Sequence, residues 1–177
     1  SASSDMNMKE IGRELGESSR MNSLKTYGVE NLPCGDISGD EVIVVEGRAD
    51  VVNLARAGIK NVVGMNGTKL PEEIKELGKE KEITLFVDGD RGGKLIAKNA
   101  CENAHISFIA VAPDGKEVEE ITEKEILMCL RKRVSVEEFF REDNRRNFSD
   151  RNEYKRNFEL DEKKKSKLKE ISGAREV

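Results

Sequence analysis

Two short acidic motifs, each placed directly after an apolar run, hold the residues of this chain that are best suited to chemistry. Glu46 follows the run at residues 42–45, and Asp88 and Asp90 follow the run at residues 83–87. Unbroken runs of branched and aromatic residues are typical of strands covered on both faces, as in a parallel sheet. Because ligands of open α/β sheets bind outside the carboxyl ends of the strands, we expect these three carboxylates to meet at one edge.

Three carboxylates gathered at one edge repel one another. At a separation of about 4 Å and an effective dielectric constant of about 20, each pair costs roughly 4 kcal/mol. Protonation or a bound cation must relieve this repulsion. Ligands that are all oxygen suit Mg²⁺, which also accepts substrate phosphates. The residues therefore indicate metal-assisted phosphoryl or nucleotidyl transfer. The alternative is that the acids only cap the helices that follow them.

Glycines and basic residues around the acids fit a phosphate ligand. Glycine lets a phosphate approach the backbone closely, and Gly47, Gly89 and Gly93 flank the acids. The helix after each turn adds the positive end of its dipole. The candidate phosphate-binding cations are Arg48, Arg91, Lys94 and Lys69. Both lysines are also compatible with plain surface positions. Asp50 either orients Arg48 or a metal-bound water, or stabilises the first helical turn.

The surrounding sequence alternates strands and helices in a way that positions these residues. We expect strands at residues 42–46, 61–65, 83–88 and 106–111, with a helix after each of the first three. Four strands with short helical connections predict an α/β fold with a four-stranded parallel sheet flanked by helices. Capping boxes at Thr122 and Ser135 predict two further short helices, at residues 123–132 and 136–141.

We expect four segments along the chain: a partly ordered N-terminal arm at residues 1–40, a core at 41–112, appended helices packed on the core at 113–140, and a charged C-terminal extension at 141–177. Met6, Ile11 and Leu15 predict at most a weak amphipathic turn within the arm. The chain begins without Met and ends on what reads as the start of another element. We therefore expect a piece of a longer protein.

Composition places the chain in the cytoplasm and away from membranes. The three cysteines are far apart and show no metal-ligand spacing, which indicates reduced thiols. No apolar run approaches the roughly 18 residues of a membrane span, and no signal peptide is evident. A formal net charge of −4 argues against a protein that coats nucleic acid without specificity.

The ordered pair of motifs resembles the Toprim domain shared by DnaG-type primases, topoisomerases and some nucleases. The motifs are E-G-x-x-D at residues 46–50 and D-G-D-R-x-G at residues 88–93, and the segment 42–140 is most similar to archaeal DnaG-type primases. The resemblance implies a Rossmann-like Toprim fold and a helical C-terminal extension. It also implies Mg²⁺-dependent synthesis of short RNA primers from ribonucleoside triphosphates on a single-stranded DNA template.

By the same resemblance, Glu46 and Asp88 would hold a first Mg²⁺, and Asp88 and Asp90 a second, with Mn²⁺ as a substitute. Two other functions remain open at this point. Archaeal relatives of this kind are associated with the exosome, which implies an RNA-binding or scaffold subunit that docks on exosome subunits through its charged extension. The third reading is a Mg²⁺-dependent Toprim nuclease, or a phosphotransferase with Asp88 as its nucleophile.

Overall fold

The buried apolar runs form four parallel strands at the centre of one sheet. A computed structural model describes residues 24–67 and 69–175, without the side chains of 173–175. The central strands lie in the order β4 (Val62–Gly64), β3 (Glu41–Val45), β5 (Glu82–Val87) and β6 (Phe108–Val111). Most of their residues are buried. The predicted α/β fold with four parallel strands is confirmed.

Three short antiparallel strands extend this sheet to seven. β1 (Lys25–Tyr27) and β2 (Leu32–Cys34) form a hairpin beside β4, and β7 (Val134–Ser135) pairs with β6. The N-terminal arm that we expected at residues 1–40 therefore contains two strands that we did not predict. Runs of two or three residues carry almost no periodicity, and a proline at position 33 argues against a strand interior, because proline has no N–H to donate. Residues 1–23, including the predicted amphipathic turn, lie outside the described residues.

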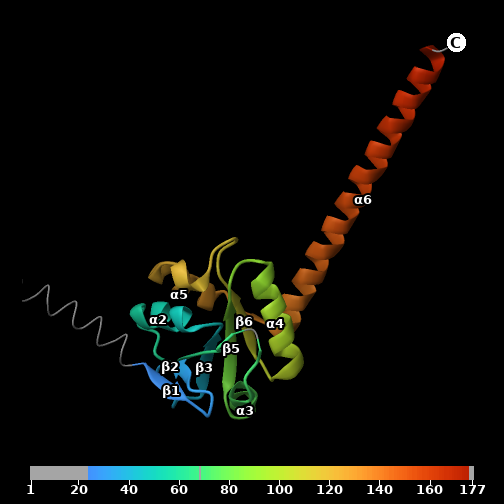
Figure 1. Cartoon of the computed structure of the whole chain (residues 1–177). Helices are drawn as coiled ribbons and strands as arrows, with labels where there is room; N and C mark the ends of the chain where they lie inside the picture. Colours follow the sequence, from blue (N-terminus) through green and yellow to red (C-terminus); the bar gives the residue numbers. More distant parts are fainter. Residues whose placement is uncertain (1–23, 68, 176–177) are drawn as a thin grey trace, which may run out of the picture. The chain divides into compact units, whose positions relative to one another are not determined.

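Helices cover both faces of the sheet (Figure 1). α2 (Arg48–Arg56) and α5 (Glu123–Arg131) lie on one side, and α3 (Glu72–Glu80) and α4 (Arg91–Asn103) lie on the other. The core under α2 and α5 is continuous. It joins strand residues to residues of both helices and of the short 3₁₀ helix η1 (Val118–Glu120), namely Ile43, Val45, Val51, Leu54, Val62, Phe86, Ala110, Ala112, Val118, Ile121 and Ile126.

The last helix is much longer than expected. We predicted a short helix at residues 136–141. Instead, α6 runs from Val136 to Arg175 and is 40 residues long. We placed the end of the helix where its apolar spacing stops. The residues that follow are rich in Lys, Arg and Glu, which have high helix propensity without any core to face. The pair Lys165–Glu162, at 4.0 Å, has the i,i+3 spacing that supports an exposed helix.

α6 belongs to a different compact unit from the sheet. The chain divides into two compact units after Val136. The segment boundaries that we expected after residues 40, 112 and 140 stay predictions. Within the described part of the chain, no helix combines the length and the apolar character needed to cross a bilayer.

The turn between β5 and α4 has no room for a side chain at its third glycine. A Cβ on Gly93 would overlap the carbonyl oxygen of Asp88. The N–H of Gly93 also donates to Asp90 Oδ1 at 2.8 Å, so Asp90 is the N-cap of α4. The backbone of the acidic motif therefore folds back on itself within a few residues.

Gly93→Ala is expected to lower the free energy of unfolding by about 1–3 kcal/mol, because the added methyl group forces the turn to open. Gly39→Ala is the control, since a Cβ there meets nothing within 4 Å. Urea unfolding of both variants measures the difference. Equal stabilities would show that the turn tolerates a side chain at residue 93.

Candidate metal and phosphate site

Glu46 and Asp88 lie at the same edge because of the strand register. β3 and β5 are parallel, with Val44 opposite Leu85. Glu46 is two residues beyond Val44, and Asp88 is three residues beyond Leu85. Each acid is the first residue after its strand, and both are half-buried.

Electrostatics shows that the predicted acids are close enough to interact. Burial raises the pKa of Glu46, and the charges of Asp88 and Asp90 raise it further. Burial also raises the pKa of Asp88, and Asp90 adds to the effect. The charges of Glu46, Asp88 and Asp90 therefore repel one another at this edge, where Glu46 and Asp88 are half-buried and Asp90 is exposed.

Backbone N–H groups hold one oxygen of each aspartate. Val118 donates to Asp88 Oδ1 at 2.8 Å, and Gly93 donates to Asp90 Oδ1 at the same distance. Asp90 therefore does cap the helix that follows it, as the alternative reading predicted, but it uses only one of its two oxygens to do so. A carboxylate has two oxygens, so the second oxygen of each aspartate stays available to another ligand.

Asp50 lies beneath this cluster and is only 8% exposed. Its Oδ2 accepts a hydrogen bond from the N–H of Gly47 at 3.0 Å, across the first turn of α2. Burial raises the pKa of Asp50 to about 6 despite this bond, and the charges of Asp88, Glu119 and Glu46 act in the same direction. The contact with Gly47 matches the role of stabilising the first helical turn.

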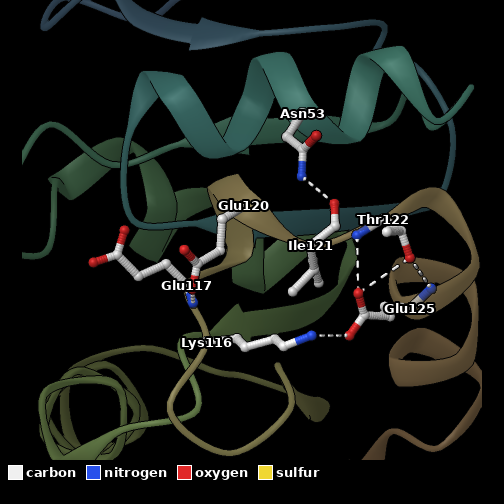
Figure 2. Close-up of polar contacts among 7 residues, drawn as sticks. All are labelled: Asn53, Lys116, Glu117, Glu120, Ile121, Thr122 and Glu125. Carbon is white, nitrogen blue, oxygen red and sulfur yellow. Dashed lines mark hydrogen bonds and ion pairs between the residues drawn. The ribbon is translucent and has the colours of Figure 1, made fainter.

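The loop between β6 and α5 contributes three acids that we did not predict as site residues: Glu117, Glu119 and Glu120. Glu119 raises the pKa of Glu46 and Asp88 in addition to that of Asp50. A hydrogen bond with Glu119 and the charge of that residue raise the pKa of Glu117 to about 7. Glu120 Oε1 accepts from the N–H of Glu117 at 2.8 Å, in the turn that Figure 2 shows.

The sequence did contain a signal for these three acids. They follow the fourth parallel strand, whose carboxyl end must reach the same edge as the ends of β3 and β5. The same strand-end argument that selected Glu46 and Asp88 therefore applies to these three acids, although we did not predict them.

The predicted glycines have two different roles. A Cβ on Gly89 would overlap the carbonyl oxygen of Pro113, so packing excludes any side chain there, as it does at Gly93. A Cβ on Gly47 would meet no atom closer than Asp50 Oδ2 at 3.9 Å. The space beside Gly47 is therefore open, and a ligand can approach the backbone at the start of α2.

The predicted cations lie at the helix starts or in an adjacent loop. Arg48 and Arg91 are the first residues of α2 and α4, and both are exposed. Lys94 is half-buried one turn into α4, and Lys69 is exposed in the loop before α3. The N-termini of α2 and α4 directly follow the acidic residues, so their unpaired N–H groups lie at the same edge.

The donors at this edge suit a hard cation. Among residues 24–67 and 69–175, no group of three or more His, Cys, Asp or Glu side chains is arranged to hold one ion. Each predicted Mg²⁺ ion needs only two carboxylates from the chain: Glu46 and Asp88 for the first ion, and Asp88 and Asp90 for the second. All of these donors are carboxylate oxygens, and Mg²⁺ binds through one or two carboxylates while keeping several waters. The residues therefore fit Mg²⁺.

Comparison with known proteins identifies the domain that carries these acids. Residues 40–112 match the Toprim domain family. These residues are therefore similar to Toprim domains. Over 137 residues it is 49% identical to DNA primase DnaG of Nanoarchaeum equitans, a match that covers 76% of this chain and 37% of the relative. It is 50% identical over 136 residues to DnaG of Methanocaldococcus jannaschii, with 76% and 32% covered.

Solved primases share the fold of this part of the chain. The RNA polymerase domain of Mycobacterium tuberculosis primase DnaG aligns with a TM-score of 0.50 and 28% identity, over 58% of this chain and 39% of that one. A DNA primase domain from Pseudomonas aeruginosa gives 0.51 and 29%, over 58% and 36%. Over about three quarters of its length, the chain is similar to the archaeal DnaG primases named above, and it spans about a third of the length of these two curated relatives.

The raised pKa of Asp50 makes stability depend on pH. The folded pKa is about 6, against about 3.9 in the unfolded chain. The contribution of Asp50 to the free energy of unfolding is therefore fully present below about pH 4 and is lost as the pH rises through 6, by at most about 3 kcal/mol. In chelator, Asp50→Asn is expected to flatten this pH dependence and to be more stable than the unsubstituted chain at pH 8.

Urea unfolding at pH 5 and pH 8 measures this effect. Asp36→Asn is the control with the opposite sign, because hydrogen bonds from Ser38 lower the pKa of Asp36. A pH dependence that is unchanged by Asp50→Asn would show that the Asp50 carboxylate is well solvated.

Proposed function

We propose that this chain is the catalytic core of a DnaG-type primase, a nucleotidyltransferase that joins ribonucleotides on a single-stranded DNA template. The observation that supports this most is that the charges of Glu46, Asp88 and Asp90 interact at the carboxyl edge of the parallel sheet, where burial also raises the pKa of Glu46 and Asp88. About 50% identity to archaeal DnaG primases supports the same function. In the reaction, a 3′-hydroxyl oxygen attacks the α-phosphorus, pyrophosphate leaves, and the hydroxyl proton passes to solvent.

The three acids have distinct tasks in this proposal. Glu46 and Asp88 would hold a first Mg²⁺, and Asp88 and Asp90 a second, with Mn²⁺ as a substitute. Bound Mg²⁺ ions would supply Lewis acidity for the attacking hydroxyl and neutralise charge on the leaving oxygens. Asp88 is shared between both sets, and its hydrogen bond from Val118 holds it in place.

The phosphates of an incoming ribonucleoside triphosphate would lie across the starts of α2 and α4. Backbone N–H groups at these helix starts and the side chains of Arg48 and Arg91 would bind phosphate oxygens. Lys94 and Lys69 would add positive charge at the rim. The open space beside Gly47 supports this placement, because a phosphate can come close to the backbone there.

Metal titration tests the first part of the proposal. A divalent ion that binds only the folded chain stabilises it by about 2.7 kcal/mol at one hundred times its Kd. We expect Mg²⁺ and Mn²⁺ to raise the melting temperature of the unsubstituted chain, compared with KCl at the same ionic strength. Glu46→Gln, Asp88→Asn and Asp90→Asn are each expected to reduce or abolish this shift.

Glu82→Gln is the matched control for these variants. Glu82 is an exposed acid at the opposite end of β5, and its loss should leave the metal-dependent shift intact. The proposal fails if divalent ions do not shift the melting temperature of the unsubstituted chain, or if all three site variants keep the full shift.

Nucleotide binding tests the second part. Arg91→Ala is expected to weaken binding of a fluorescent ATP analogue in the presence of Mg²⁺ by about tenfold or more, since hydrogen bonds to charged groups contribute about 1.5–3 kcal/mol. Fluorescence anisotropy measures the Kd. Lys79→Ala is the control, because Lys79 pairs with Glu76 at 3.0 Å on α3. Equal affinities for the two variants would remove Arg91 from the phosphate site.

A further inference from the structure

The segment between β6 and α5 is bonded on one side to the turn that carries Asp88. The N–H of Gly89 donates to the carbonyl of Lys116 at 2.9 Å, and the N–H of Gly115 donates back to the carbonyl of Gly89 at 2.7 Å. The N–H of Val118, the first residue of η1, donates to Asp88 Oδ1 at 2.8 Å. The orientation of Asp88 therefore depends on where η1 lies.

On its other side, η1 is held by one side chain of α2. Asn53 Nδ2 donates to the carbonyl of Val118 at 2.8 Å and to the carbonyl of Ile121 at 2.9 Å. Figure 2 shows the bond to Ile121, with the Asn53 amide reaching across from α2. Both hydrogens of the amide are used, one at each end of the short turn. Val118 and Ile121 are buried, so their carbonyls have little access to water as an alternative partner.

Asn53 thus connects the two motifs that carry the acids. It lies on α2, which begins two residues after Glu46. Through Val118 it reaches the hydrogen bond that orients Asp88. A displacement of η1 away from α2 would move the Val118 N–H and would change the position of Asp88 relative to Glu46. Two hydrogen bonds from a single amide oppose that displacement.

We infer that Asn53 is a positioning residue, which acts through η1 and Val118 to hold Asp88 in the arrangement with Glu46 that binds a divalent ion. The effect on metal binding rests on the proposed function. The effect on the hydrogen bond between Val118 and Asp88 does not rest on the proposed function, because that contact is present without any ion.

The test compares Asn53→Ala with Asn61→Ala in the 177-residue chain. Asn61 also donates from its side-chain amide to a backbone carbonyl, that of Glu41 at 3.1 Å, but it lies at the opposite end of the strands. The two readouts are the Kd for Mn²⁺ and the hydrogen-exchange rate of the Val118 amide measured by NMR in chelator. A third variant, Asn53→Gln, keeps the amide donor and provides a second sample if Asn53→Ala does not fold.

Asn53→Ala is expected to raise the Kd for Mn²⁺ by about tenfold or more, the usual effect of losing a group that orients a metal ligand. It is also expected to speed exchange at Val118, whereas Asn61→Ala should change neither quantity. For both the Kd and the exchange rate, Asn53→Gln should give a value between those of Asn53→Ala and the unsubstituted chain. If Asn53 only contributed to the stability of the fold, Asn53→Ala and Asn61→Ala would show the same Kd and the same exchange rate whenever they lower the melting temperature equally.

Two results would overturn the inference: unchanged Val118 exchange in Asn53→Ala, or faster exchange with an unchanged Kd for Mn²⁺. If the unsubstituted chain binds no Mn²⁺, the proposed function fails, and with it the metal-binding part of the inference. Exchange at Val118 then still decides whether Asn53 maintains the hydrogen bond between Val118 and Asp88.

Discussion

Repulsion among carboxylates at the carboxyl edge of the sheet is the constraint on which the rest of the structure depends. Three parallel strands deliver acids to this edge, directly in β3 and β5 and through the following loop in β6. Burial and mutual charge raise the pKa of several of them. Backbone N–H groups offset part of this cost, because Gly47, Gly93 and Val118 each donate to one of the aspartates.

These backbone donors exist because the turns are very tight. The chain passes so close to itself that Gly89 and Gly93 cannot carry a side chain. The same compactness places the N–H of Gly93 against Asp90 and the loop from β6 against Asp88. The glycines in the second motif therefore serve the acids mainly through backbone packing, whereas Gly47 leaves space for a ligand.

The sequence was most informative where chemistry follows directly from a strand end. Glu46 and Asp88 each follow a buried apolar run, and the two runs are neighbouring parallel strands, as the sequence indicated. Asn53 gave no such signal, since its partners lie 65 and 68 residues away and accept through backbone carbonyls, which carry no sequence information. The edge strands were too short for periodicity, and α6 continues on helix propensity after its apolar pattern ends.

A hydrogen bond from the backbone and metal binding are compatible roles for the two aspartates of the second motif. Each gives Oδ1 to a backbone N–H, which fixes the carboxylate plane and leaves Oδ2 for a ligand. Glu46 has a longer side chain, and no backbone N–H in the described part of the chain donates to it. Under the proposed function, two rigid carboxylates and one adjustable carboxylate would share the ions. The longer side chain of Glu46 could change its position during nucleotidyl transfer without moving the backbone that holds the two aspartates.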